Sequence, residues 1–401
     1  MHNKISKKTM WKSKMKIKNK VLQTGTLLCS LLAAGLVNAS PVTMEGQAVK
    51  PMIGAGTSSD YGSGGAPFVQ AGEFTGVVSI EIVRDGGVYI CTGSAISSRH
   101  IITAAHCIER NDGSIMDLSA GTVSAVFSDG GNFVDYIPSS SVVAHPDYLG
   151  FAVCSASDGA GFSGVCLNDD IAILTLEEDI PAGVEIYDFY TGDVDSGDIF
   201  TMVGYGTTGN GYDGYTGSPD WTNKRYGFNI PEIFDCDDAS IAPDRSGGYA
   251  SSAACPAVFG SEAEVWYADF DGYFTGEING TMYTDVLVDR FCALYGIGCG
   301  AFFDSDTTTG LFEATIGGGD SGGPSFIYDS TNDKFLLAAN NTFGANTSPI
   351  ADGAFGDRFG GNLYAPYLDW INSITNANAP ATLAILLSGL GIMVVRRRKA
   401  K

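Results

Sequence analysis

The stretch Gly317-Gly318-Gly319-Asp320-Ser321-Gly322-Gly323-Pro324 decides how this chain is interpreted. A serine hydroxyl is a poor nucleophile at its own pKa, so it needs a neighbouring base. It also needs backbone N–H groups directed at the oxyanion that forms when a carbonyl is attacked. Glycines around Ser321 allow the backbone to form that pocket without side-chain clashes. The stretch therefore indicates a nucleophilic serine, and the chain must supply its base elsewhere.

Two upstream stretches complete a catalytic pattern. His106 in Thr103-Ala104-Ala105-His106-Cys107 supplies a base, and Asp170 ends Asn168-Asp169-Asp170 before an apolar run. Together, and in this chain order, the three stretches resemble the trypsin/chymotrypsin-like serine proteases. The resemblance implies a catalytic triad of His106, Asp170 and Ser321, in which the amides of Gly319 and Ser321 form the oxyanion hole.

Other segments extend the resemblance over roughly residues 72 to 375: Cys91–Ile96, His145–Tyr148, Val203–Thr208 and Leu363–Ile371. The implied fold is all-β, with two antiparallel six-stranded barrels and a short C-terminal helix, in a protease domain spanning 66–375. His106 and Asp170 would come from the first barrel and Ser321 from the second, with the site in the cleft between them.

Hydrophobic patterns agree with this fold class. The chain has 53 glycines and many aromatic residues, which suits short strands and turns. Strands are predicted at Gly76–Val83, Ile171–Leu176, Phe200–Gly204 and Phe335–Ala339, and a helix at Tyr364–Ile374. A Tyr-, Gly- and Asp-rich insertion lies near 212–283.

Activation and specificity follow from the resemblance in part. Asp320 is the expected partner of a freed N-terminal amine, and Ile53 is the best candidate for that terminus, although it lies about ten residues too far upstream for the family's usual spacing. Thr315 and Ile316 would form the base of the substrate pocket, flanked by Gly344 and Gly361. No acid lies at that base, so we expect a small or medium apolar side chain before the cut.

The function predicted is a secreted or surface-anchored serine endopeptidase. Two other classes remain open. One is a catalytically silent homologue that acts as a binding module, and the other is an ester hydrolase with the same triad. Asp320-Ser321-Gly322 lacks the Gly-x-Ser-x-Gly setting of α/β-hydrolases, which disfavours that fold.

The N-terminus reads as an export signal over residues 1–39, followed by a propeptide or N-terminal segment over 40–65. Cys29 lies within that signal, and export favours disulfides among the other cysteines. The resemblance implies the pair Cys91–Cys107. Proximity along the chain suggests three more pairs, Cys154–Cys166, Cys236–Cys255 and Cys292–Cys299.

The C-terminus carries a linker at 376–379 and a membrane or sorting tail at 380–401. An apolar run of about 15 residues, short for a stable span, precedes Arg396-Arg397-Arg398-Lys399. The tail resembles PEP-CTERM-type sorting signals, although Ala-Pro-Ala replaces their usual Pro-Glu-Pro. A plain membrane anchor is the alternative. We expect export to the periplasm, cell surface or exterior of a Gram-negative bacterium.

The net charge of the chain limits the classes of partner that it can bind. The formal net charge is −22, and residues 40–395 hold all 45 acidic side chains. Such a surface repels nucleic acid, so protein or peptide substrates and, through the tail, a membrane are the expected partners. No cofactor is predicted. No Cys-x-x-Cys or histidine cluster indicates a metal, and calcium, which Asp-rich loops can bind, is not indicated by any EF-hand spacing.

Overall fold

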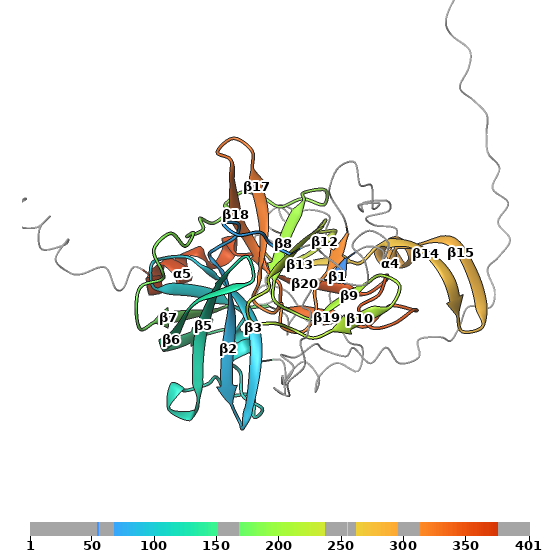
Figure 1. The fold of residues 1–401 in the computed structure, drawn as a ribbon. Coiled ribbons are helices and arrows are strands. Elements are labelled where there is room, and N and C mark those ends of the chain that lie inside the picture. The colour runs from blue at the N-terminus through green and yellow to red at the C-terminus, as the bar shows by residue number, and fades with distance from the viewer. Residues whose placement is uncertain are drawn as a thin grey trace, which may run out of the picture. The chain divides into compact units, whose positions relative to one another are not determined.

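The computed structural model describes residues 54–55, 68–150, 168–236, 255, 262–295 and 313–375. These residues form antiparallel sheets with two short α-helices and single turns of 3-10 helix (Figure 1). The predicted all-β class is confirmed. The predicted signal, the linker and the terminal apolar helix lie outside the described residues.

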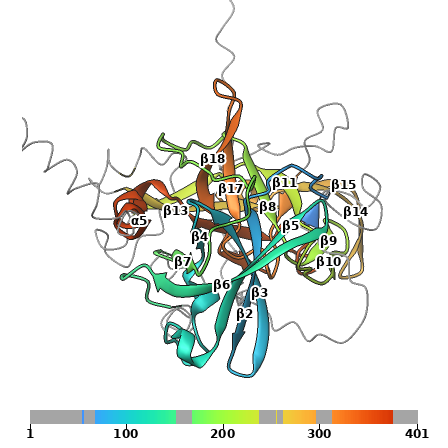
Figure 2. The same ribbon diagram turned by 60° about the vertical axis from the view of Figure 1, so that its left-hand side comes forward.

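The first half of the domain is a closed six-stranded barrel, as predicted, with the strand order β2-β3-β4-β7-β6-β5. The long strand β6 pairs with both β5 and β7 and so closes the ring (Figure 2). Its strands are β2 (Val77–Arg84), β3 (Gly87–Ala95), β4 (His100–Thr103), β5 (Thr122–Asp129), β6 (Asn132–Ala144) and β7 (Ala172–Leu176).

Alternation along β2 explains how the barrel fills its interior. Val78, Ile80 and Ile82 belong to the same buried apolar cluster, whereas Val77 belongs to another cluster on the opposite face. Successive side chains of a strand point to opposite faces. A slip of one residue would turn these three side chains out of the barrel interior, so the apolar pattern fixes the register of β2 against β3 and β5.

The second half consists of two four-stranded sheets in the described residues. One has the order β11-β8-β17-β18 and the other β12-β13-β20-β19. An isolated bridge between Ala339 and Leu363 links them. The strands are β8 (Phe200–Gly204), β11 (Arg225–Asn229), β12 (Ile233–Cys236), β13 (Ala263–Asp269), β17 (Pro324–Asp329), β18 (Lys334–Asn340), β19 (Phe343–Ala345) and β20 (Arg358–Asn362).

This arrangement differs from the predicted second closed barrel, which is not confirmed. The remaining strands pair off in twos instead of completing a ring. These pairs are β1 (Gly54–Ala55) with β16 (Ala314–Thr315), β9 (Thr208–Asn210) with β10 (Gly214–Gly217), and β14 (Gly272–Ile278) with β15 (Thr281–Val288). The β14–β15 pair belongs to the insertion predicted near 212–283.

Helices are few and short: η2 (Ala105–Ile108), η3 (Leu118–Ala120), α4 (Arg290–Tyr295), η6 (Ala365–Tyr367) and α5 (Leu368–Thr375). Together η6 and α5 occupy the helix predicted at 364–374. In the part of the chain that the structure describes, no helix has both the length and the apolar character needed to cross a bilayer.

An apolar cluster joins the two halves. It combines Ile102 and Ile173 of the barrel with Phe326 and Leu337 of the second half and Ile371 of α5. We call the contact between the two halves along this cluster the seam. Burial of each large apolar side chain there contributes about 1.5–3 kcal/mol to the stability of the fold. The two halves are therefore held as one unit, and residues at the seam can act together.

Candidate active site

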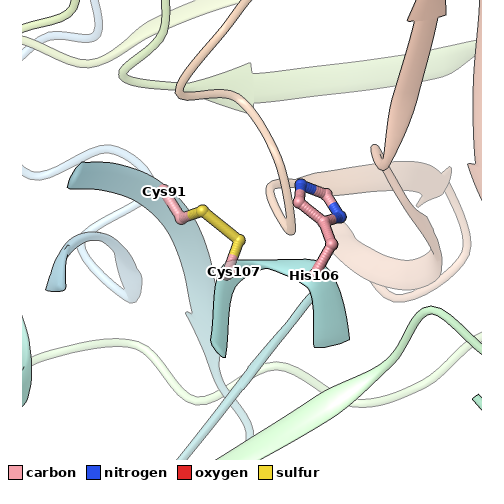
Figure 3. A group of neighbouring side chains, drawn as sticks. All are labelled: Cys91, His106 and Cys107. Atoms are coloured by element: carbon pink, nitrogen blue, oxygen red, sulfur yellow. A yellow bond between two sulfur atoms is a disulfide. The ribbon is translucent and has the colours of Figure 1, made fainter. Parts of the chain in front are cut away.

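His106 lies in η2, the single 3-10 turn that follows β4. The disulfide Cys91–Cys107 ties this turn to β3, with a sulfur–sulfur distance of 2.06 Å. Figure 3 shows the disulfide on one side of the turn and the imidazole pointing away from it. The ring is 4% exposed, so packing fixes its position.

Asp170 fixes the orientation of that ring. Its Oδ2 lies 2.6 Å from His106 Nδ1, and its Oδ1 accepts the backbone N–H of His106 at 2.8 Å. Asp170 is fully buried. Because the carboxylate holds Nδ1, the other ring nitrogen, Nε2, is the one turned toward other groups. The neighbouring Asp169 instead contacts His145 Nδ1 at 3.0 Å.

The loop that carries Ser321 packs against the same turn. Ser321 O accepts the N–H of Thr92 at 2.8 Å and lies 3.7 Å from Cys107 Sγ. The hydroxyl of Thr92 also donates to Gly319 O at 2.8 Å. Thr92 of β3 therefore clamps the serine loop onto the first barrel, and Ser321 is 4% exposed there.

Gly322 shows how closely the halves meet. Its φ is +78°, and a Cβ at this position would lie 2.1 Å from Thr103 Oγ1 and 2.5 Å from the Ala104 amide nitrogen. Such contacts are closer than any side chain permits. The glycine predicted to shape the pocket is thus required by the approach of the loop to the segment before His106.

Asp320 is fully buried behind the serine loop. Its carboxylate accepts the N–H groups of Gly206 at 2.7 Å and Gly317 at 2.9 Å. Burial raises the pKa of Asp320 to about 7, because these hydrogen bonds only partly offset the loss of water. No salt bridge reaches Asp320 within the described ranges.

The N-terminal segment reaches this region. Gly54 pairs with Thr315 and Ala55 with Ala314 in the β1–β16 pair. β1 lies within the segment predicted as a propeptide, directly after Ile53. The residues adjoining the candidate new terminus are therefore in register with the strand that leads into the serine loop.

The predicted pocket residues lie on or directly after three strands, β16, β19 and β20. Thr315 and Ile316 are buried at the end of β16, and Gly344 is buried in β19. Gly344 pairs with Phe359 of β20, not with Gly361.

Gly361 packs elsewhere, since a Cβ there would lie 1.9 Å from Asn340 O. Phe359 is fully buried in the same apolar cluster as Ile316. No sequence motif marks Phe359, because only strand register identifies the residue opposite Gly344.

The structure contains the disulfides Cys91–Cys107 and Cys236–Cys255, the latter with a sulfur–sulfur distance of 1.99 Å. Cys292 is also disulfide-bonded. Cys154, Cys166 and Cys299 lie outside the described residues, so the pairs Cys154–Cys166 and Cys292–Cys299 remain predictions. Disulfides are typical of proteins in oxidising compartments.

Three comparisons bear on this geometry. The family described as Trypsin matches residues 69–225. Venom serine protease Bi-VSP from Bombus ignitus is 38% identical over 97 residues, which cover 24% of this chain and 22% of that protein. The solved structure of HL collagenase is 15% identical with a TM-score of 0.42, over 78% of this chain and 97% of that one.

The chain thus spans only about a fifth of the length of the curated relative that it matches. The family match includes the first barrel, His106 and Asp170, and ends before Ser321. Residues 69–225 are similar to the family described as Trypsin, and the first barrel, with its paired histidine and aspartate, lies within this matched part of the chain.

Proposed function

We propose that this chain is an exported serine endopeptidase that cleaves peptide bonds through an acyl-enzyme on Ser321. One observation carries the proposal. Asp170 holds both the side chain and the backbone of His106, while the backbone of Ser321 packs against the same disulfide-bonded turn. A nucleophile, a base and an orienting carboxylate on one seam are the parts that acyl transfer requires.

Acylation begins when the Ser321 hydroxyl attacks the peptide carbonyl. His106 Nε2 takes the hydroxyl proton, and Asp170 stabilises the imidazolium through the proton on Nδ1. The carbonyl oxygen becomes an oxyanion, which the amides of Gly319 and Ser321 stabilise. His106 then gives the proton to the leaving amine, and the C–N bond breaks.

Deacylation reverses these roles with water. Water loses a proton to His106 and attacks the ester carbon of the acyl-enzyme, and the proton returns to Ser321 Oγ as the ester bond breaks. The products are a carboxylic acid and an amine, and the enzyme is regenerated without a cofactor being consumed.

Specificity is proposed for an uncharged small or medium apolar side chain before the cut. Thr315 and Ile316 offer no charge at the base of the pocket, and Phe359 lies opposite Gly344. A peptide panel checks this preference by kcat/KM. A strong preference for Arg or Lys would overturn it.

Activation is proposed to follow cleavage before Ile53. The pairing of Gly54 with Thr315 and the buried, unneutralised carboxyl of Asp320 both support this. The freed amine would give Asp320 a cation. N-terminal sequencing of the processed protein checks the site, and a mature terminus within the protease domain, beyond residue 68, would rule out Ile53.

Export and attachment belong to the same proposal. Residues 1–39 would direct export, and residues 380–401 would anchor or sort the chain at the surface of a Gram-negative cell. The disulfides of the domain support an oxidising compartment. Loss of surface-associated protein after truncation at residue 379 is the expected result.

The central test uses processed full-length protein and a fluorophosphonate label, which reacts only with an activated serine. We expect wild type and the exposed-serine control Ser373→Ala to be labelled and to hydrolyse peptides, and Ser321→Ala to do neither. Absence of labelling in correctly processed wild type would favour the silent binding homologue. Labelling with cleavage of esters but not peptides would favour the ester hydrolase.

A further inference from the structure

A second group of chemically reactive side chains lies in the sheet half of the domain, outside the proposed triad. It consists of four buried acids: Glu232 before β12, Asp269 at the end of β13, Asp271 two residues later, and Asp289 before α4. One carboxylate oxygen from each lies within 4.8 Å of those of the others. Their exposed fractions are 1%, 1%, 2% and 7%, respectively. We call this group the acid cluster.

Backbone amides hold one oxygen of three of these carboxylates. Asp269 N donates to Glu232 Oε2 at 3.2 Å, and Cys292 N donates to Asp289 Oδ1 at 2.7 Å. The amides of Arg290 and Phe291 both donate to Asp269 Oδ2, Phe291 at 3.0 Å. The first turn of α4 therefore orients two acids of the cluster.

Other carboxylate oxygens of the acid cluster receive no such hydrogen bond from a backbone amide. Glu232 Oε1, Asp269 Oδ1 and Asp271 Oδ1 are buried, and among the described residues no group outside the acid cluster donates a hydrogen bond to them. No salt bridge reaches these three acids in that part of the chain. Buried charges are normally paired or bound to a metal, because an uncompensated carboxylate loses its hydration.

We propose that the acid cluster binds one calcium ion. Carboxylate oxygens are the ligands that hard divalent cations prefer. Calcium–oxygen distances are about 2.3–2.6 Å, so oxygens that all lie within 4.8 Å of one another can bind the same calcium ion. Magnesium usually keeps several waters and takes only one or two carboxylates, so a buried set of four carboxylates favours calcium.

Four carboxylates fill part of a calcium shell, which takes six to eight oxygens. Second carboxylate oxygens and water would complete it. The ligands come from separate segments instead of one continuous loop, which is why no EF-hand spacing marks the site in the sequence. The four carboxylates would repel one another when ionised, and one Ca²⁺ bound among them would offset this repulsion.

The ion would connect the β14–β15 pair to the β12–β13 region of the sheet half. Asp271 and Asp289 flank the β14–β15 pair, whereas Glu232 and Asp269 belong to the β12–β13 region. Asn229 Nδ2 donates to both Asp269 O at 3.0 Å and Ala314 O at 2.9 Å. The site would thus hold both ends of the β14–β15 pair beside β16, the strand that bears Thr315. The inference concerns binding and does not depend on catalysis by Ser321.

The test uses full-length protein with Ser321→Ala, which prevents self-cleavage. Tb³⁺, excited through the protein's aromatic residues, probes binding directly, since the carbonyl of Tyr267 accepts the N–H of Glu232 at 2.9 Å. Ca²⁺ and Mg²⁺ compete in separate titrations. Tm is then measured in calcium and in chelator for this protein, for Asp271→Asn and for the exposed control Glu277→Gln.

We expect one saturable Tb³⁺ site from which Ca²⁺ displaces the probe at lower concentration than Mg²⁺. Calcium at about 100 times its Kd should raise Tm by about 5–10 °C. Glu277→Gln should keep this shift. Asp271→Asn should lose at least tenfold in affinity and, in chelator, should melt higher than the parent because one buried charge is gone.

Three results would overturn the proposal. One is the absence of a saturable Tb³⁺ site, which needs no variant to interpret. Another is an equal calcium shift in Asp271→Asn and in Glu277→Gln. The third is a higher Tm of Asp271→Asn by the same amount in calcium and in chelator, which would mean that protons neutralise the acids. If Asp271→Asn does not fold, Glu232→Gln takes its place in each comparison.

Discussion

At the scale of single residues, the two adjacent aspartates have different partners. Asp170 accepts from both nitrogens that His106 presents to it, whereas Asp169 turns to His145 and has a φ of +62°. The left-handed φ of Asp169 reverses the chain so that the two carboxylates diverge. Residue type alone does not show which of the two aspartates pairs with His106. The position of Asp170 directly before the buried Ile171 predicts that it is Asp170, and its hydrogen bonds to His106 agree with this prediction.

Asp170→Asn tests this difference. The amide would present an N–H where His106 Nδ1–H needs an acceptor, so the imidazole would adopt the wrong tautomer. We expect kcat to fall by about 10⁴-fold with little change in KM. Asp169→Asn is the matched control, because asparagine tolerates a positive φ, and it should keep kcat within a few-fold. Equal losses in both variants would contradict the role of Asp170.

Asp320 gives a pH prediction. Its pKa is raised to about 7 from 3.8, so the folded chain binds the proton more tightly than the unfolded chain. The free energy of unfolding of the uncleaved protein should therefore fall as pH rises between these values, by about 4 kcal/mol. Denaturant titrations of Ser321→Ala, with and without Asp320→Asn, isolate this slope.

The difference between the two proteins isolates the titration of Asp320, because all other titratable groups are present in both. The loss of hydrogen bonds in Asp320→Asn is the same at every pH and does not add a slope. Cleavage before Ile53 should abolish the slope, since the new amine stabilises the ionised carboxylate. The same slope in both backgrounds would show that Asp320 does not titrate in this range.

At the scale of elements, periodic strands were the most predictable feature. The strands at 77–84, 200–204 and 334–340 lie within a residue of the predictions from alternation. The second closed barrel did not follow, because its pairing depends on contacts between distant segments that local patterns do not encode. The acid cluster was missed for the same reason. Acidic residues are usually exposed, and only the β12–β13 register and the capping of α4 bring these four together.

The candidate site also has a part that local motifs predict and a part that depends on contacts between distant segments. Short motifs predicted His106, Asp170 and Ser321 as the triad, and the structure contains the expected hydrogen bond between the first two. The pocket was less predictable, because Phe359 faces Gly344 only through the register of β19 and β20. Thr92 lies in the segment Cys91–Ile96 that extends the resemblance, but nothing in that segment predicted its hydrogen bonds to the serine loop.

The disulfide between β3 and η2 offers a prediction at this scale. Its loop has a sequence separation of 16, so replacing Cys91 and Cys107 together by alanine should cost about 3 kcal/mol of unfolding free energy. Because the same bond positions the turn of His106, kcat should fall as well. Cys236→Ala with Cys255→Ala is the control: its separation is 19, so the stability loss should be similar while kcat stays near wild type. Chemical denaturation and steady-state kinetics measure both effects.

At the scale of the whole molecule, the charge of −22 should guide which substrates arrive fastest. For two peptides that differ only in flanking charge, kcat/KM of the cationic one should fall by about tenfold as ionic strength rises from about 0.01 to about 0.15 M. The neutral peptide should change little. Parallel behaviour of both peptides would show that the acidic surface does not steer association.

The close approach of Gly322 to Thr103 and Ala104 means that the proposed hydrolytic activity would require the complete, folded domain. His106, the proposed base, lies in the first barrel, and Ser321, the proposed nucleophile, lies in the second half, which is synthesised later. The two residues come together only after the two halves have packed against each other. Under the proposed mechanism, an unfinished chain or a fragment that holds only one half would therefore be inactive. The order of assembly would then protect the producing cell from the proposed activity, independently of any propeptide.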